Sequence, residues 1–224
     1  MGFCRSVAVV TLVIALAPAA QAGDADCARA VAERVQRRYE KVRDLHARFE
    51  QRTERASLGG APAEALVASG EVVFAKPGKM RWRYESPEPS LVVSDGATLW
   101  IYDEKAREAQ KLALKEGYLS AAGVQFLLGE GKLLDEFEIT AKQCAGATVS
   151  LGLVPKRDAQ YERLELGVDP KSGAVLETVV VDLFGNRTVV AFRGMRENAG
   201  AEPGLFRFED VLAVGATQGA PWMQ

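Results

Sequence analysis

Most of this chain alternates between apolar and polar residues with a period of two, which is typical of β-strands. In the clearest case, Lys79–Glu85, the residues Met80, Trp82 and Tyr84 share one face and only charged residues lie on the other. Turn sequences rich in Gly, Pro, Asp and Asn separate such runs. The pattern predicts about eleven strands: Leu45–Glu50, Leu66–Phe74, Lys79–Glu85, Ser90–Ser94, Ala97–Tyr102, Arg107–Leu112, Phe137–Ala141, Thr148–Val154, Tyr161–Val168, Ala174–Leu183 and Arg187–Arg193.

Helical patterns are few in comparison. Apolar residues recur at three- and four-residue steps over residues 28–42, which predicts one amphipathic helix. A second helix or helical pair is predicted over Tyr118–Leu128. Short links between the strands favour antiparallel pairing, and an open sheet of this size tends to curl. The predicted fold is therefore mainly β with some α: a half-open (unclosed) antiparallel β-barrel with helices covering its mouth.

The first 22 residues have the three parts of a secretory signal peptide. Arg5 precedes an apolar run from Val7 to Ala17, and Ala20-Gln21-Ala22 is a small-residue cleavage site. The apolar run is too short to span a bilayer, which needs about 20 residues. We expect cleavage after Ala22, which leaves residues 23–224 as a single domain outside the cytoplasm.

Composition and motifs argue against most enzyme classes. The net charge of −2 does not favour nucleic-acid binding. A single histidine, His46, excludes multi-histidine metal sites, and the sequence lacks a phosphate loop and a GxSxG motif. We therefore predict a binding protein rather than an enzyme, with no cofactor and no metal.

Loss of the leader would leave two cysteines, Cys27 and Cys144. One disulfide is plausible in an oxidising compartment, and two buried free thiols fit the sequence equally well.

Three sequence blocks carry a family resemblance: Lys76–Tyr84, Leu91–Gly96 and Leu99–Asp103, which read KPGKMRWRY, LVVSDG and LWIYD. Asp182, Gly185, Asn186 and Thr188 near the end of the chain, and Phe49 with Gln51 on the first strand, add to them. With these blocks the chain resembles the periplasmic outer-membrane lipoprotein carrier family, LolA, over nearly all of the expected mature sequence.

The resemblance implies an eleven-stranded unclosed barrel that carries lipoproteins through the periplasm. Its members take acylated lipoproteins from an ABC-type lipoprotein-releasing complex in the inner membrane. They shield the acyl chains in a hydrophobic cavity and deliver them to the outer membrane, where an acceptor lipoprotein is a further expected partner. We expect the protein to act as a monomer without nucleic-acid partners.

The uncharged face of Lys79–Glu85 and its apolar neighbours are the predicted acyl-binding residues: Met80, Trp82, Tyr84, Leu91, Val93, Trp100, Phe126 and Leu127. Val31 and Val35 are expected on the lid helix. The best-studied family members have an arginine that ties the lid to the barrel, and Lys76 occupies that position here. Lysine keeps the charge but lacks the planar fork of arginine, so the latch is expected to be weaker or built differently.

Two other functions fit parts of the pattern. A LolA-like lipid or lipoprotein sensor would use the same half-barrel without shuttling, although such sensors usually have a second domain. A periplasmic hydrolase would need a nucleophile and a base that the sequence does not reveal.

Overall fold

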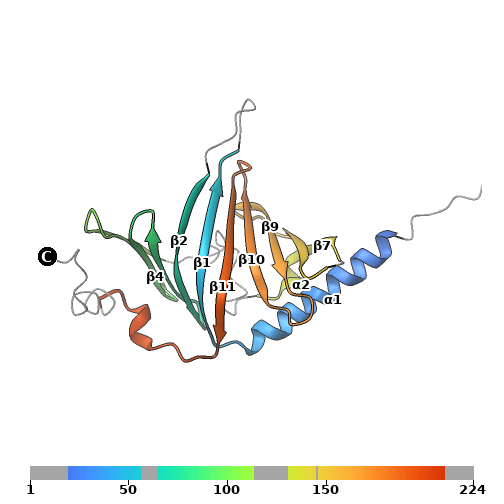
Figure 1. The fold of residues 1–224 in the computed structure, drawn as a ribbon, viewed down its shortest axis with the longest axis horizontal. Helices are drawn as coiled ribbons and strands as arrows, with labels where there is room; N and C mark the ends of the chain where they lie inside the picture. Colours follow the sequence, from blue (N-terminus) through green and yellow to red (C-terminus); the bar gives the residue numbers. More distant parts are fainter. Residues whose placement is uncertain (1–19, 57–64, 114–130, 145, 210–224) are drawn as a thin grey trace, which may run out of the picture.

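One antiparallel sheet of eleven strands forms the centre of the computed structural model, which describes residues 20–56, 65–113, 131–144 and 146–209 (Figure 1). Its strands are β1 (Asp44–Glu54), β2 (Leu66–Ala75), β3 (Lys79–Ser86), β4 (Ser90–Asp95), β5 (Thr98–Asp103), β6 (Glu108–Ala113), β7 (Phe137–Gln143), β8 (Val149–Pro155), β9 (Tyr161–Val168), β10 (Val175–Asp182) and β11 (Arg187–Glu197). The unclosed sheet and the positions of its strands agree with the predictions from sequence.

The strand order is β6-β5-β4-β3-β2-β1-β11-β10-β9-β8-β7. Each strand therefore lies beside its neighbour in the chain, except at the central pairing of β1 with β11 and at the two edges. Within the described residues the edge strands β6 and β7 do not pair with each other, so the barrel remains open.

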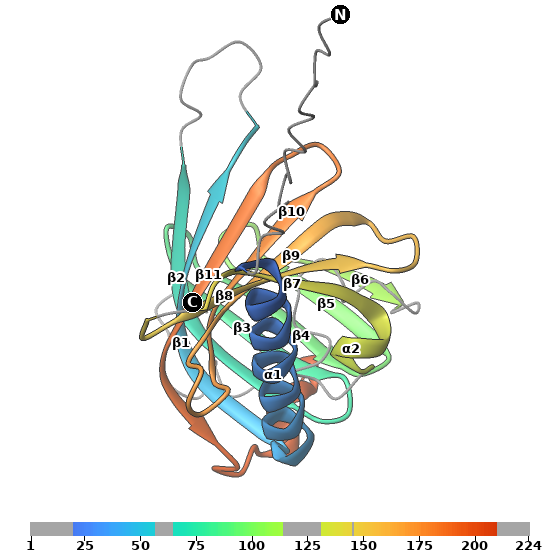
Figure 2. The same ribbon diagram turned by 90° about the vertical axis from the view of Figure 1, so that its right-hand side faces the viewer.

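The helical elements bounded within the described residues are α1 (Ala20–Lys41), α2 (Leu133–Glu136) and the 3₁₀ turn η3 (Pro203–Phe206). Figure 2 shows α1 crossing in front of the curved sheet, and α1 packs against β7, β8 and α2. The amphipathic pattern predicted α1 from residue 28, whereas α2 and η3 are too short to give a periodic signal. Within the part of the chain that is described, no helix has both the length and the apolar composition needed to cross a membrane.

We call the face of the sheet that shares a hydrophobic core with α1 the inner face. Cross-strand register brings alternate residues of all the longer strands to this face, because side chains on a strand alternate between its two sides. The core joins the apolar stripe of α1 to the inner side chains of the sheet, which include Leu45, Phe49, Phe74, Met80, Trp82, Leu151, Leu153, Leu164, Leu166, Val190 and Phe192.

A disulfide between Cys27 and Cys144 attaches α1 to the chain just after β7. The two residues are 117 positions apart in sequence, and their Cα atoms are 6.2 Å apart. Of the two states that the sequence allowed, the structure has the bonded one.

Candidate binding site on the inner face

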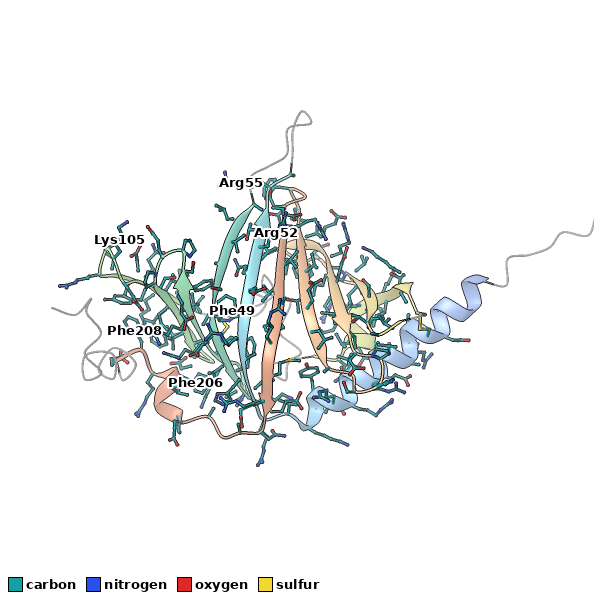
Figure 3. The ribbon with its side chains drawn as sticks, viewed as in Figure 1. Phe49, Arg52, Arg55, Lys105, Phe206 and Phe208 are labelled. Carbon is teal, nitrogen blue, oxygen red and sulfur yellow. A yellow bond between two sulfur atoms is a disulfide. The ribbon has the colours of Figure 1, made fainter. Side chains whose placement is uncertain are left out.

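Aromatic rings cover the centre of the inner face. Trp82 on β3 contacts all the other rings of the cluster. The ring centroid of Phe49 on β1 (labelled in Figure 3) lies 4.8 Å from that of Trp82 and 5.0 Å from that of Tyr84. Phe74 and Phe192 approach Trp82 to 5.6 and 6.4 Å. We call these five residues the aromatic floor. Such edge-to-face contacts add about 0.5–1.5 kcal/mol per pair beyond simple burial.

A glycine on β2 allows this ring packing. Gly70 lies in register between Phe49 on one side and Tyr84 on the other. A Cβ atom at Gly70 would come within 1.9 Å of the Arg83 carbonyl oxygen, so no other residue fits this close approach without a shift of β3. The missing side chain lets the rings of Phe49 and Tyr84 meet across the strand.

Met80 extends the inner face toward the β2–β3 turn. It is 5% exposed and lies in register between Phe74 and Ser94. The predicted trio of Met80, Trp82 and Tyr84 is therefore brought together on the inner face, as the alternation on this strand indicated. Over β4–β6 the inner face continues with side chains that are only partly covered by the described residues: Val92, Ile101 and Leu112.

Three of the predicted acyl-binding residues lie on the opposite, convex face, so their assignment to the same surface is wrong. Leu91 and Val93 are in register with the outward residues of β3, and Trp100 is in register with Val93. The side chains of all three are covered on the convex face, not on the inner face. The segment after β11 returns over β3 and β4, and Phe208 stacks on Trp100 at 6.0 Å between centroids (Figure 3).

The two predicted lid-helix residues, Val31 and Val35, are buried in the core at 5% and 0% exposure. Polar contacts hold their helix in place on several sides. Arg38 forms an ion pair with Glu197 at the end of β11, with 2.7 Å between Nε and Oε1. The Gln36 side chain accepts a hydrogen bond of 3.0 Å from the backbone N–H of Leu133 in α2.

Tyr39 on α1 forms a hydrogen bond with the start of β10. Its hydroxyl oxygen accepts a 3.1 Å hydrogen bond from the backbone N–H of Val175 at the start of β10. Burial raises the pKa of Tyr39 to about 12, and the bond from Val175 only partly opposes this rise. The phenol therefore stays neutral, which suits its position in the core.

Lys76 contacts the C-terminal end of α1. Its ammonium group donates a hydrogen bond to the carbonyl oxygen of Tyr39, and its backbone N–H bonds to the Arg43 carbonyl at 2.9 Å. A cation is favourable here because the last carbonyls of a helix carry partial negative charge. Burial lowers the pKa of Lys76, and Glu40 nearby partly offsets that effect.

A pocket of about 420 Å³ opens between the first turns of α1, α2 and β7. Its walls mix apolar and charged side chains: Ala25, Arg29, Leu134, Asp135, Phe137 and Ile139. Phe137 and Ile139 belong to the inner face of β7, so this pocket adjoins one edge of the site. Its volume falls within the roughly 300–1,000 Å³ of small-molecule sites.

Two predicted acyl-binding residues, Phe126 and Leu127, lie outside the described residues. The sequence predicted the strands of Phe49 and Phe192 but did not place either residue in the acyl site. Their place in the aromatic floor depends on the pairing of β1 with β2 and β11.

The chain is similar to known proteins of one family. A model of the family described as "Outer membrane lipoprotein carrier protein LolA" matches residues 40–209. An outer-membrane lipoprotein carrier protein of Cupriavidus necator is 34% identical over 142 residues, which cover 63% of this chain and 66%, just under two thirds, of that relative. The carrier of Azotobacter vinelandii is 31% identical over 179 residues, covering 79% of this chain and 83% of the relative. The crystal structure of a LolA superfamily protein from Nitrosomonas europaea aligns with a TM-score of 0.45 at 13% identity, over 81% of this chain and 98% of that chain.

Proposed function

Because the chain belongs to the outer-membrane lipoprotein carrier family, LolA, we propose that it carries lipoproteins through the periplasm with their acyl chains on the inner face of the sheet. The observation that carries this proposal is the aromatic floor on the concave side of an unclosed barrel. The floor is a wide uncharged part of the inner face, and acyl chains bind through apolar area rather than through directed bonds.

Carriage requires that binding be weaker than full burial would make it. Each buried CH₂ contributes about 0.8 kcal/mol, and three acyl chains contain on the order of 40 of them. Complete burial would therefore exceed the roughly 18–21 kcal/mol at which non-covalent affinities saturate. The rings of the aromatic floor pack against one another, and the cost of opening this packing keeps the cargo transferable.

In this proposal, lipoproteins are transferred from the inner membrane to the outer membrane. Removal of the signal peptide after Ala22 would make Gly23 the N-terminal residue of the mature protein. The mature chain would then begin within α1, four residues before Cys27. The mature protein, acting as a monomer, receives lipoproteins from an ABC-type releasing complex in the inner membrane and passes them to an acceptor in the outer membrane. Depletion of the protein should then make lipoproteins accumulate in the inner membrane, whereas loss of a sensor would leave their distribution unchanged.

Trp82 gives a direct test of the acyl site. In a variant with Trp100 and Trp222 replaced by Phe, addition of a triacylated lipopeptide should shift the emission of Trp82, because the acyl chains replace its present neighbours. The matched control retains Trp100 alone, which lies on the convex face under Phe208 and should not respond. An unchanged Trp82 spectrum at saturating ligand, or an equal response from Trp100, would remove the aromatic floor from the site.

Lys76 acts in this proposal as the latch between α1 and the β2–β3 turn. The change Lys76→Met should destabilise the fold by about 1 kcal/mol, since it removes a charged hydrogen bond from a partly exposed site. It should also speed the exchange of bound lipopeptide, measured by stopped-flow fluorescence. Lys76→Arg should retain the latch, and Lys41→Met, at an exposed position of the same helix end, should have no effect. Normal exchange in Lys76→Met would show that this contact is not a latch.

A further inference from the structure

A polar band crosses the inner face on the strands at the centre of the sheet. In one row Thr178, Val190 and Gln51 are in register across β10, β11 and β1. In the next row Val180, Thr188 and Thr53 are in register on the same strands. We call Gln51, Thr53, Thr178 and Thr188 the polar band. It borders the aromatic floor directly, because Phe49 and Phe192 form the adjoining row.

Thr178 is the unexplained member of this band. It is 1% exposed, and its hydroxyl has no hydrogen-bond partner among the residues that the structure describes. Two other buried side-chain atoms of the described residues share this condition, but they belong to His46 and Arg81 on the convex face. A buried hydroxyl without a partner is destabilising, and a valine would fill the same space without that cost.

The side-chain amide nitrogen of Gln51 is a second hydrogen-bond donor in the band, and its hydrogen bond is weak. Its side-chain oxygen accepts a 3.0 Å bond from the Tyr84 hydroxyl, so the carboxamide is held in one orientation. Its nitrogen then has only a long contact of 3.4 Å to the hydroxyl of Thr53. The band thus offers hydrogen-bond donors from Thr178 and Gln51 beside a surface that is otherwise apolar.

Donors beside an apolar surface suit a ligand with acceptors at one end of its hydrocarbon. Acyl chains meet this description, because each is joined to the rest of the molecule through an ester or amide carbonyl. We propose that the polar band is the subsite for these carbonyl groups, with the Thr178 hydroxyl as a donor. The hydrocarbon then lies over the aromatic floor, and the protein portion of the cargo leaves past the β1–β2 and β10–β11 ends of the strands.

This subsite rests on the proposed function, since it assigns the orientation of an acylated cargo already bound on the inner face. The subsite also explains why a hydroxyl without a partner is buried at Thr178. The hydroxyl has no partner among the described residues and gains one when cargo binds, so its bond contributes to binding and not to folding.

The test compares two probes, a synthetic triacylated lipopeptide and n-hexadecane, which has no carbonyl. Their affinities are measured by displacement of a hydrophobic fluorescent dye. Thr178→Val should weaken lipopeptide binding about threefold to tenfold, as expected for one hydrogen bond, and leave hexadecane binding unchanged. Thr178→Ser keeps the hydroxyl and should retain the preference for the lipopeptide. The control Thr140→Val removes an exposed hydroxyl from β7 and should alter neither affinity.

Two further readouts separate a ligand contact from a structural effect. The melting temperature of Thr178→Val should equal or exceed that of the wild type, because the buried hydroxyl has no partner to lose. With ¹³C-labelled lipopeptide, the infrared band of a bound carbonyl should lie at higher frequency in Thr178→Val than in the wild type. Equal changes for both probes, or no change for either, would overturn the subsite alone. Failure of the wild-type protein to bind either probe would overturn the proposed function, and the subsite with it.

Discussion

Phe49→Ala is expected to lower the free energy of unfolding by about 3–5 kcal/mol, the usual cost of removing a buried aromatic ring. Phe49 is 1% exposed on a central strand, and its ring contacts both Trp82 and Tyr84. Its neighbours cannot close the space readily, because Gly70 beside it has no side chain to contribute. The free energy is measured by urea unfolding followed by circular dichroism.

Phe184 provides the matched control for this change. It lies in the turn between β10 and β11 with 83% of its surface exposed, so Phe184→Ala should alter the stability by less than about 0.5 kcal/mol. A loss below about 1 kcal/mol in Phe49→Ala would mean that the aromatic floor is not packed as described.

The second large effect is expected from the disulfide. The double change Cys27→Ser and Cys144→Ser should destabilise the protein by up to about 4.7 kcal/mol, because the bond closes a loop of over a hundred residues in the unfolded chain. The bonded residues are 117 positions apart, and a longer closed loop costs the unfolded chain more conformational entropy. Thermal or urea unfolding of the purified variant gives the measurement.

Reduction supplies the control for this prediction. Dithiothreitol should lower the stability of the wild type to that of the double serine variant and leave the variant itself unchanged. Equal stabilities of oxidised and reduced wild type would contradict the prediction.

The sequence predicted each of the eleven strands that the structure describes, because alternation and turn residues are local signals. It could not assign the faces of β4 and β5 correctly. Val92 and Ile101 are apolar on the inner side, while Leu91 and Trp100 are apolar on the convex side. Alternation shows an inner face only when the other face meets water, and here the segment after β11 covers it. The residues of that segment, Phe206 and Phe208, are too few to show a period.

The candidate site could also be predicted only in part from the sequence. Its trio on β3 followed from one strand, whereas the aromatic floor, the Lys76 contact with α1 and the polar band all depend on residues brought together by register. The pairing of Cys27 with Cys144 was left open for a similar reason, because distance in space cannot be read from separation in sequence. In each case the missing information was long-range pairing rather than local preference.

The central pairing of β1 with β11 has a consequence for how the protein is made. The strands β1–β6 and β7–β11 are two series of neighbouring hairpins, and β1 pairs with β11 to join them. A chain synthesised from its N-terminus exposes the β1 edge long before β11 is available. Unpaired edges of this kind invite pairing with other chains. Until β11 is available, the first half of the chain therefore has an unpaired strand edge at which aggregation can begin.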